Sequence, residues 1–127
     1  MDENRQSLGG FKISEDVVAA IASLAASEVE GVAGLHGGLV GDLSQMLGKR
    51  SLGKGVKVEL GTREAAIDLY LVVKYGISIP AVAQATQERV KQAVESMTGL
   101  TVVEVNVHVR GVSFDDDDAQ GKEVRVR

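Results

Sequence analysis

Apolar and polar residues alternate in two stretches of the chain, residues 103–109 and, less regularly at Val72, residues 66–73. The aliphatic positions are Ile67, Leu69, Leu71, Val73, Val103, Val105, Val107 and Val109. A two-residue period rich in branched side chains is typical of strands with one buried face and one wetter face. We therefore predict two strands whose aliphatic side chains point into a core. The expected core positions are Leu69, Leu71, Val105 and Val107.

A different period separates the two strands, because apolar residues within 79–97 recur three or four positions apart. This spacing predicts a helix with one apolar face. Pro80 suits its first turn, where the missing N–H would have no partner. Gly99 suits its C-terminus, which often needs a positive φ. The stretch 64–110 is therefore read as strand, helix and strand.

A second long helix is predicted near the N-terminus, over residues 15–30. Apolar residues recur there at helical spacing, Ser14 is a suitable N-cap, and Gly31 is a suitable end. The stretch Phe11–Ile13, just before the cap, is read as a short edge strand.

Most of the glycines lie within residues 31–61, which we expect to be the mobile part of the domain. A short helix is predicted at 42–47, because Asp42 can cap it and Gln45 completes a capping box. Residues 56–60 alternate as a strand and should form an antiparallel hairpin with the strand at 66–73.

These elements predict an α+β fold with a small sheet of three or more strands. An antiparallel hairpin and the strand–helix–strand unit supply the strands, and the two long helices pack on one face of the sheet. The domain is expected to span residues 11–114. Residues 1–10 are expected to be a flexible N-terminal arm. Residues 115–127, which begin with four aspartates, are expected to be an acidic and then basic disordered tail.

The composition of the chain argues against several classes of function. The 127-residue chain has a net charge of −4, 3% aromatic residues and no cysteine. It therefore offers no general attraction for phosphate backbones, few rings for base stacking, and no thiolate or zinc–cysteine site. No apolar run approaches the ~20 residues that span a bilayer, and the N-terminus lacks the apolar core of a signal peptide. We expect a cytoplasmic protein that does not insert into the membrane.

The sequence offers no convincing catalytic motif. Residues 48–55 nearly match a Walker A loop, but Gly55 replaces the magnesium-binding hydroxyl, and a strand follows instead of a helix. His36 and His108 are too few for a histidine metal cluster and are interpreted as surface residues. We therefore expect no enzyme activity, no cofactor and no metal site.

Two groups of residues are candidates for binding a partner protein. The first is the apolar side of the predicted short helix with the basic residues that follow it, and the second is the centre of the outer sheet face. Their members are Leu43, Met46, Leu47, Lys49, Arg50 and Lys54, and Tyr70 and Val72. The basic loop and a G-x-x-G match at 34–37 leave a nucleic-acid-binding regulator as the alternative, although the negative charge makes nucleic acid a disfavoured partner.

Three blocks of sequence carry a family resemblance. They are Ile13-Ser14-Glu15-Asp16-Val17-Val18 through Glu30-Gly31-Val32-Ala33-Gly34-Leu35, then Tyr75-Gly76-Ile77-Ser78-Ile79-Pro80, then Met97-Thr98-Gly99-Leu100 through Val105-Asn106-Val107-His108-Val109. In this order and at this spacing they resemble the bacterial alkaline shock protein family, the envelope stress response proteins. The resemblance covers about residues 11–114.

The resemblance implies a non-enzymatic protein of cell-envelope homeostasis that is abundant under envelope or alkaline stress. It also implies a homo-oligomer that lies at the inner face of the cell membrane by binding a small membrane-anchored partner. The family offers no agreed catalytic residues, so none is assigned to this chain.

Overall fold

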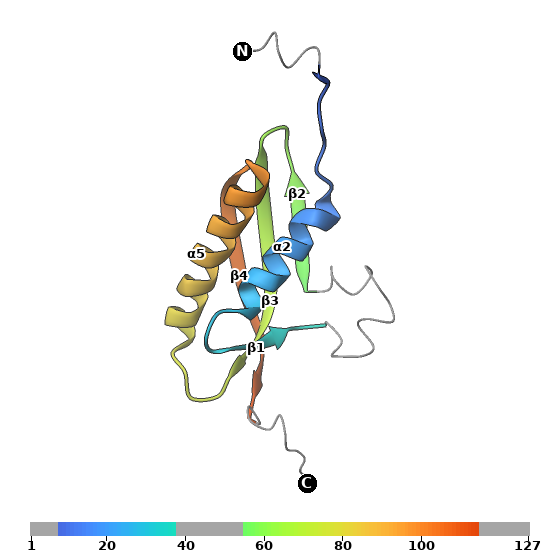
Figure 1. The fold of residues 1–127 in the computed structure, drawn as a ribbon. Coiled ribbons are helices and arrows are strands. Elements are labelled where there is room, and N and C mark those ends of the chain that lie inside the picture. Colours follow the sequence, from blue (N-terminus) through green and yellow to red (C-terminus); the bar gives the residue numbers. More distant parts are fainter. Residues whose placement is uncertain (1–7, 38–54, 115–127) are drawn as a thin grey trace.

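The computed structural model describes residues 8–37 and 55–114. Within them the elements follow in the order α2 (Glu15–Ser27), β1 (Val32–Leu35), β2 (Val56–Leu60), β3 (Glu64–Lys74), α5 (Ile79–Thr98) and β4 (Thr101–Ser113) (Figure 1). The short helix predicted at 42–47, the tail predicted at 115–127 and most of the predicted N-terminal arm lie outside the described residues.

The sheet is organised around β3, with which each of the other strands pairs. β4 runs parallel to β3 along its whole length, from Thr101 opposite Glu64 to Ser113 opposite Lys74. On the other edge, β3 pairs antiparallel with both β2 and β1, which lie one after the other along it. The predicted hairpin and the predicted strand–helix–strand unit are both confirmed, and together they make a mixed sheet.

Each helix begins after a serine that caps it, and of the two caps Ser14 was predicted. The Ser14 hydroxyl accepts the Val17 N–H at 3.2 Å, and the Ser78 hydroxyl accepts the Ala81 N–H at 3.3 Å. α5 ends at Thr98 and is capped by Gly99, whose φ of +79° is readily adopted by glycine. α2 ends at Ser27, a few residues earlier than predicted.

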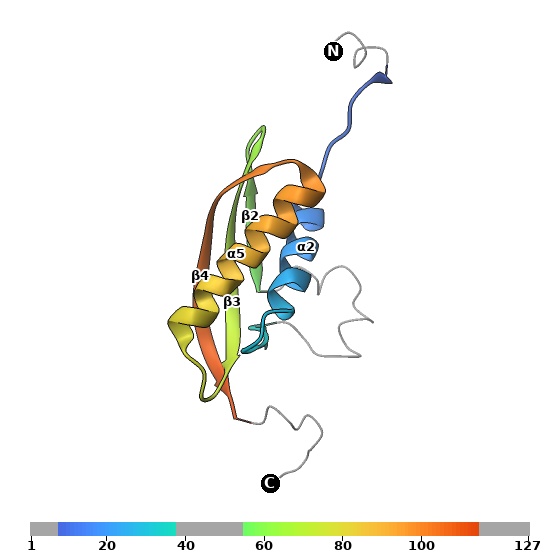
Figure 2. The same ribbon diagram turned by 60° about the vertical axis from the view of Figure 1, so that its left-hand side comes forward.

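Both helices cover the same face of the sheet, as predicted, so the fold has two layers (Figure 2). The core lies between these layers and is aliphatic. Its members include Val18, Ala22 and Ala26 from α2, Val82, Val90 and Val94 from α5, and Ile67, Leu69, Leu71 and Val73 from β3. Thr86 is also buried there, and its hydroxyl donates to the Val82 carbonyl at 2.8 Å. The opposite face of β3 and β4 carries neither helix.

The predictions for two short segments are wrong. Val32–Leu35 is a strand and not part of a mobile glycine-rich loop, because Val32 is buried in the core and pairs with Val73. Phe11–Ile13 is not a strand, since these residues pair with no neighbouring strand and the Phe11 side chain is 84% exposed. Long-range pairing decides both cases, and a local pattern carries little information about it.

β4 departs from strict alternation at two places, where its register with β3 shifts by one residue. At the first shift Val102 is buried whereas Val103 is 55% exposed, so the prediction that Val103 faces the core is wrong. Val105 is buried as predicted, and Val107 packs against the core while partly exposed. At the second shift Arg110 is the additional residue. Such bulges re-aim side chains along a strand.

Candidate functional site

The outer face of the sheet, on the side away from both helices, is the candidate interaction surface (Figure 2). Asp68, Tyr70 and Val72 of β3 point to this face, because the residues between them are buried under the helices. All three are only partly exposed. Neighbouring side chains of the sheet therefore cover part of their surface.

Tyr70 lies at the centre of a connected cluster. Its ring stacks on His108 with centroids 4.6 Å apart and planes inclined by 16°. The Arg110 guanidinium lies 4.8 Å from the centroid of the same ring, within the range of a cation–π contact. His108 Nε2 lies 3.2 Å from Asp68 Oδ1. Asp68, Tyr70, His108 and Arg110 are named here the Tyr70 cluster.

Strand register explains why these four residues meet. Tyr70 and His108 are directly paired between β3 and β4, and Asp68 is two positions away on the same face. Arg110 is the additional residue at the second register shift, which allows it to reach the Tyr70 ring. Alternation alone placed Tyr70 and His108 on this face. It did not reveal that they are opposite each other, and it gave no reason to select Arg110.

The charges on the outer face are separated along the strands. Exposed carboxylates gather where β3 begins, because Glu59 of β2 and Glu104 of β4 both pair with Ala66, close to Glu64. These three glutamates are named the acidic end. Lys74 and Arg110 lie where β3 finishes and are named the basic end.

No ion pair joins the acidic end to the basic end within the described residues. Lys57 lies between the two ends, opposite Asp68. The outer face therefore has a charge direction that runs along its strands.

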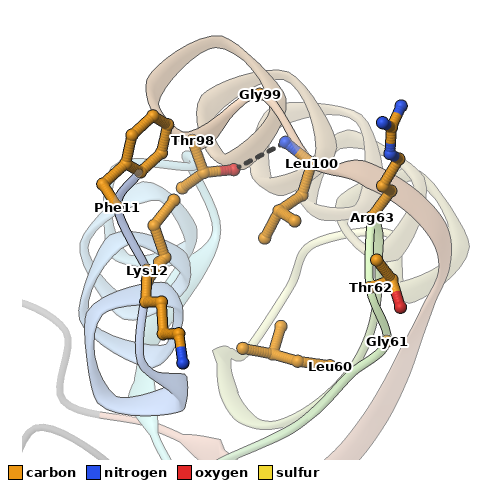
Figure 3. A pocket seen from close by; sticks show the side chains of 10 residues that line it. Phe11, Lys12, Leu60, Gly61, Thr62, Arg63, Thr98, Gly99 and Leu100 are labelled. Atoms are coloured by element: carbon orange, nitrogen blue, oxygen red, sulfur yellow. Dashed lines mark hydrogen bonds between the residues drawn. The ribbon is translucent and has the colours of Figure 1, made fainter. Parts of the chain in front are cut away.

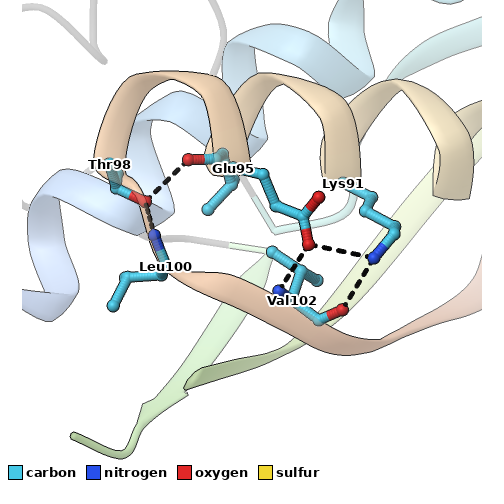
Figure 4. Close-up of polar contacts among 6 residues, drawn as sticks. Lys91, Glu95, Thr98, Leu100 and Val102 are labelled. Carbon is cyan, nitrogen blue, oxygen red and sulfur yellow. Dashed lines mark hydrogen bonds and ion pairs between the residues drawn. The ribbon is translucent and has the colours of Figure 1, made fainter. Parts of the chain in front are cut away.

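The free edge of β4 is partly occupied by side chains of α5 (Figure 4). Lys91 Nζ donates to the Val102 carbonyl at 3.1 Å, and Glu95 Oε2 accepts the Val102 N–H at 2.9 Å. Gln87 Nε2 donates to the Val105 carbonyl at 3.0 Å. These groups are the ones that a further strand would need, so α5 protects this part of the edge.

The same contacts act on the charge of Glu95. The Val102 N–H and then the Lys91 ammonium stabilise its carboxylate form, and they hold the pKa of Glu95 below its ordinary value of 4.5.

A pocket of about 490 Å³ lies at one end of the domain, between Phe11–Ile13, the β2–β3 turn and the end of α5 (Figure 3). Leu60 and Leu100 point into it, whereas Arg63 points away. The Thr98 hydroxyl is already used, since it donates to the Val94 carbonyl and accepts the Leu100 N–H. The lining includes no carboxylate and no histidine. Among the described lining residues, the charged side chains are those of Lys12 and Arg63.

The predicted site residues fall into two groups. Tyr70 and Val72 lie on the outer face as expected, with Tyr70 inside the cluster. The other six candidates (Leu43, Met46, Leu47, Lys49, Arg50 and Lys54) lie outside the described residues.

Two further observations concern the described ranges alone. No three histidine, aspartate or glutamate side chains come together there as a metal site would require. Neither α2 nor α5 has the combined length and apolarity of a helix that crosses a bilayer.

Comparison with known proteins shows which sequence family the chain matches. The sequence model of the alkaline shock protein family, described by its cell envelope-related function, matches residues 3–114. This chain belongs to that family. The resemblance predicted from the three sequence blocks is therefore confirmed.

Among relatives of this alkaline shock family member is the protein YqhY of Bacillus subtilis. It is 40% identical over 99% of this chain and 91% of its own length. A Streptococcus pyogenes protein named a homolog of the stress response regulator gls24 is 33% identical over 80% of this chain and 57% of its own length. Solved structures of the MamM CTD share 16% identity and a TM-score of 0.48, over 76% of this chain and 93% of that one.

Proposed function

We propose that this family member is a non-enzymatic structural and interaction protein of the cell-envelope stress response. In this proposal it associates with itself and is recruited to the inner face of the cell membrane by a membrane-anchored partner protein. The observation that carries the proposal is the outer sheet face with the Tyr70 cluster at its centre.

The composition of this face supports a role in protein binding. Tyrosine and arginine are enriched at the energetically important positions of protein interfaces. Here Tyr70 and Arg110 are held in contact with each other, so little conformational freedom remains to be lost when a partner binds. Of the apolar residues of the two helices, Val18, Ala22, Val90 and Val94 are buried in the core, whereas Val17 and Leu24 of α2 are exposed.

The family gives the biological setting of the proposal. Its description is cell envelope-related, and a relative is named for a stress response. Recruitment by a partner accounts for envelope function in a protein whose described helices do not cross a membrane. The six candidate residues of the 43–54 region, together with Tyr70 and Val72, remain the proposed contacts for partners.

Membrane binding by purified protein tests the recruitment. We would compare inverted membrane vesicles from the bacterium that encodes the chain, the same vesicles after protease treatment, and protein-free anionic vesicles. Binding to the untreated vesicles alone is expected, because the negative net charge disfavours anionic lipid. Equal binding to protein-free vesicles, or no binding to any of the three, would contradict recruitment by a partner protein.

The nucleic-acid alternative has its own test in a titration of random RNA and DNA at several salt concentrations. The proposal expects no binding that falls steeply with salt. Salt-sensitive binding that is lost when Lys49, Arg50 and Lys54 are neutralised would favour the alternative.

A further inference from the structure

We propose that two copies of the chain associate through their outer sheet faces with their β3 strands antiparallel. The acidic end of each face then lies over the basic end of the other. The inference rests on the proposed self-association and specifies its surface and its orientation.

The charge direction of the outer face is the first reason. Glu59, Glu64 and Glu104 at one end, and Lys74 and Arg110 at the other, make no ion pair with each other within the described residues. A surface whose two ends carry opposite charge complements a second copy of itself after a half-turn. The parallel orientation would instead place glutamates over glutamates and cations over cations.

Strand register makes this arrangement specific. A two-fold axis that lies between the two faces, perpendicular to β3 and level with its middle residue Leu69, relates Glu64 of one copy to Lys74 of the other. In the register of β4 with β3, Glu104 is paired with Ala66, and Arg110 precedes Gly111, which is paired with Val72. These two places along β3 are called the levels of Ala66 and Val72. Because those two levels are equally far from Leu69, Glu104 of each copy faces Arg110 of the other.

The centre of the face fits the same axis. Asp68 and Tyr70 lie one residue on either side of Leu69, so each Tyr70 ring faces the Asp68 carboxylate of the other copy. Packed sheets are usually rotated by about 30°, which displaces pairs far from the axis more than pairs near it. Glu104 and Arg110 lie nearer the axis than Glu64 and Lys74, so they are the better pair for a test.

The β4 edge is a less suitable surface for a second copy. A strand added there would need the Val102 and Val105 backbone groups, which Lys91, Glu95 and Gln87 already bind (Figure 4). On the outer face no described element has to be displaced. Association through the face therefore breaks none of these hydrogen bonds, unlike the addition of a strand at the β4 edge.

The size of the face sets the expected strength. Eleven residues of β3 with a strand on each side cover about 36 Å by about 14 Å. Each copy would then bury roughly 500 Å², and the pair roughly 1,000 Å², which is the lower end of specific interfaces. The dimer is thus expected to form at micromolar concentrations and to dissociate on dilution.

Charge reversal gives a direct test by sedimentation equilibrium of purified full-length chains. Glu104→Arg and Arg110→Glu each place two like-charged pairs across the two-fold axis, so each variant alone should dissociate at least about tenfold more readily than the wild type. An equimolar mixture of the two variants restores both opposite-charge pairs. It should therefore form a mixed dimer at least as stable as the wild-type dimer.

The same restoration is expected when both reversals are present in one chain. Arg89→Glu is the matched control, because Arg89 is exposed on α5 and bonds to Glu28, away from the outer face. This variant should leave the dimer unchanged. Circular dichroism melts should show that all variants are folded, since Glu104 and Arg110 are exposed.

The outcomes separate the two proposals. A wild-type chain that self-associates but does not respond to either reversal, or a mixture no stronger than the single variants, would overturn the face-to-face arrangement and leave self-association intact. A wild-type chain that stays monomeric at about 100 µM, well above the range expected for such an interface, would overturn both. Membrane recruitment is measured separately with the vesicles and does not depend on either result.

Discussion

Tyr70 and His108 lie directly opposite each other in the parallel pair of β3 and β4, and their rings stack with centroids 4.6 Å apart. No helix holds these rings, because they lie on the outer face. Their conformation is fixed instead by each other, by Arg110 above the Tyr70 ring and by Asp68 beside His108. The centre of the open face is therefore ordered before any partner arrives.

A double-mutant cycle should detect this stacking. Tyr70→Ala and His108→Ala, alone and combined, are expected to show a coupling of about 0.5–1 kcal/mol in the free energy of unfolding. Urea denaturation at a concentration where the chain is monomeric measures it. Tyr70→Ala combined with Glu88→Ala, which is remote from the cluster, should be additive. Strict additivity for Tyr70 and His108 would show that the rings do not interact in solution.

Val103 and Val105 of β4 should differ strongly in how much replacement by aspartate destabilises the domain. Val105→Asp places an unpaired charge in the core and should cost more than about 3 kcal/mol, enough to unfold a marginal domain. Val103→Asp places the same side chain on the surface and should cost less than about 1 kcal/mol. Thermal melts of the two variants check this difference. Similar melting temperatures would show that the register shift in β4 is incorrectly placed.

Two glycines with similar backbone angles should tolerate alanine unequally. Gly31 and Gly76 have φ values of +100° and +96°, so alanine carries a backbone strain of about 1 kcal/mol at either position. A Cβ atom at Gly31 would also lie 2.6 Å from Val82 Cγ2, whereas one at Gly76 meets no atom within 4 Å. Gly31→Ala should therefore be destabilised by a further ~1–3 kcal/mol relative to Gly76→Ala. Equal effects in chemical denaturation would contradict this close approach.

Glu95 should make the stability of the domain depend on pH. Its pKa is lowered in the folded chain, so the folded chain binds this proton more weakly than the unfolded chain does. The resulting stabilisation is present above the ordinary pKa of 4.5 and is lost as the pH falls through the folded pKa. The melting temperature of Glu95→Gln should thus fall below that of the wild type at neutral pH and approach it in acid.

The control for this series is Glu88→Gln. The Glu88 side chain makes no hydrogen bond or ion pair with any other described residue, so Glu88→Gln measures the effect of removing an exposed α5 carboxylate that has no such partner. A constant difference between wild type and Glu95→Gln from neutral to strongly acidic pH would show that the carboxylate charge does not contribute.

Periodicity was sufficient for the elements that carry it strongly. The alternation in β3 and the helical spacing in α5 placed both elements and their buried sides, and Ser14 and Gly99 marked helix ends. β1 was missed because four residues that include Gly34 have little intrinsic preference for a strand, and only pairing with β3 makes them one.

The centre of the candidate site was only partly predictable. A period of two assigns residues to a face but does not fix which residues of two strands are opposite each other. The valines at 102 and 103 are adjacent in sequence, so either could have faced the core, and the bulge decides between them. The second bulge brings Arg110 to Tyr70, and Gly111 was its local sign in the sequence. A glycine inside a strand often marks a bulge.

The shared edge of β1 and β2 has a consequence for the length of the chain between them. The Tyr70 carbonyl accepts the His36 N–H at 2.7 Å, and the Tyr70 N–H donates to the Gly55 carbonyl at 2.9 Å. One residue of β3 thus anchors the chain where it leaves the sheet and where it returns. Doubling the length of a connection between fixed ends costs only about 0.6 kcal/mol. A change in the length of the chain between these two anchors is therefore expected to leave the pairing of β1 and β2 with β3 in place.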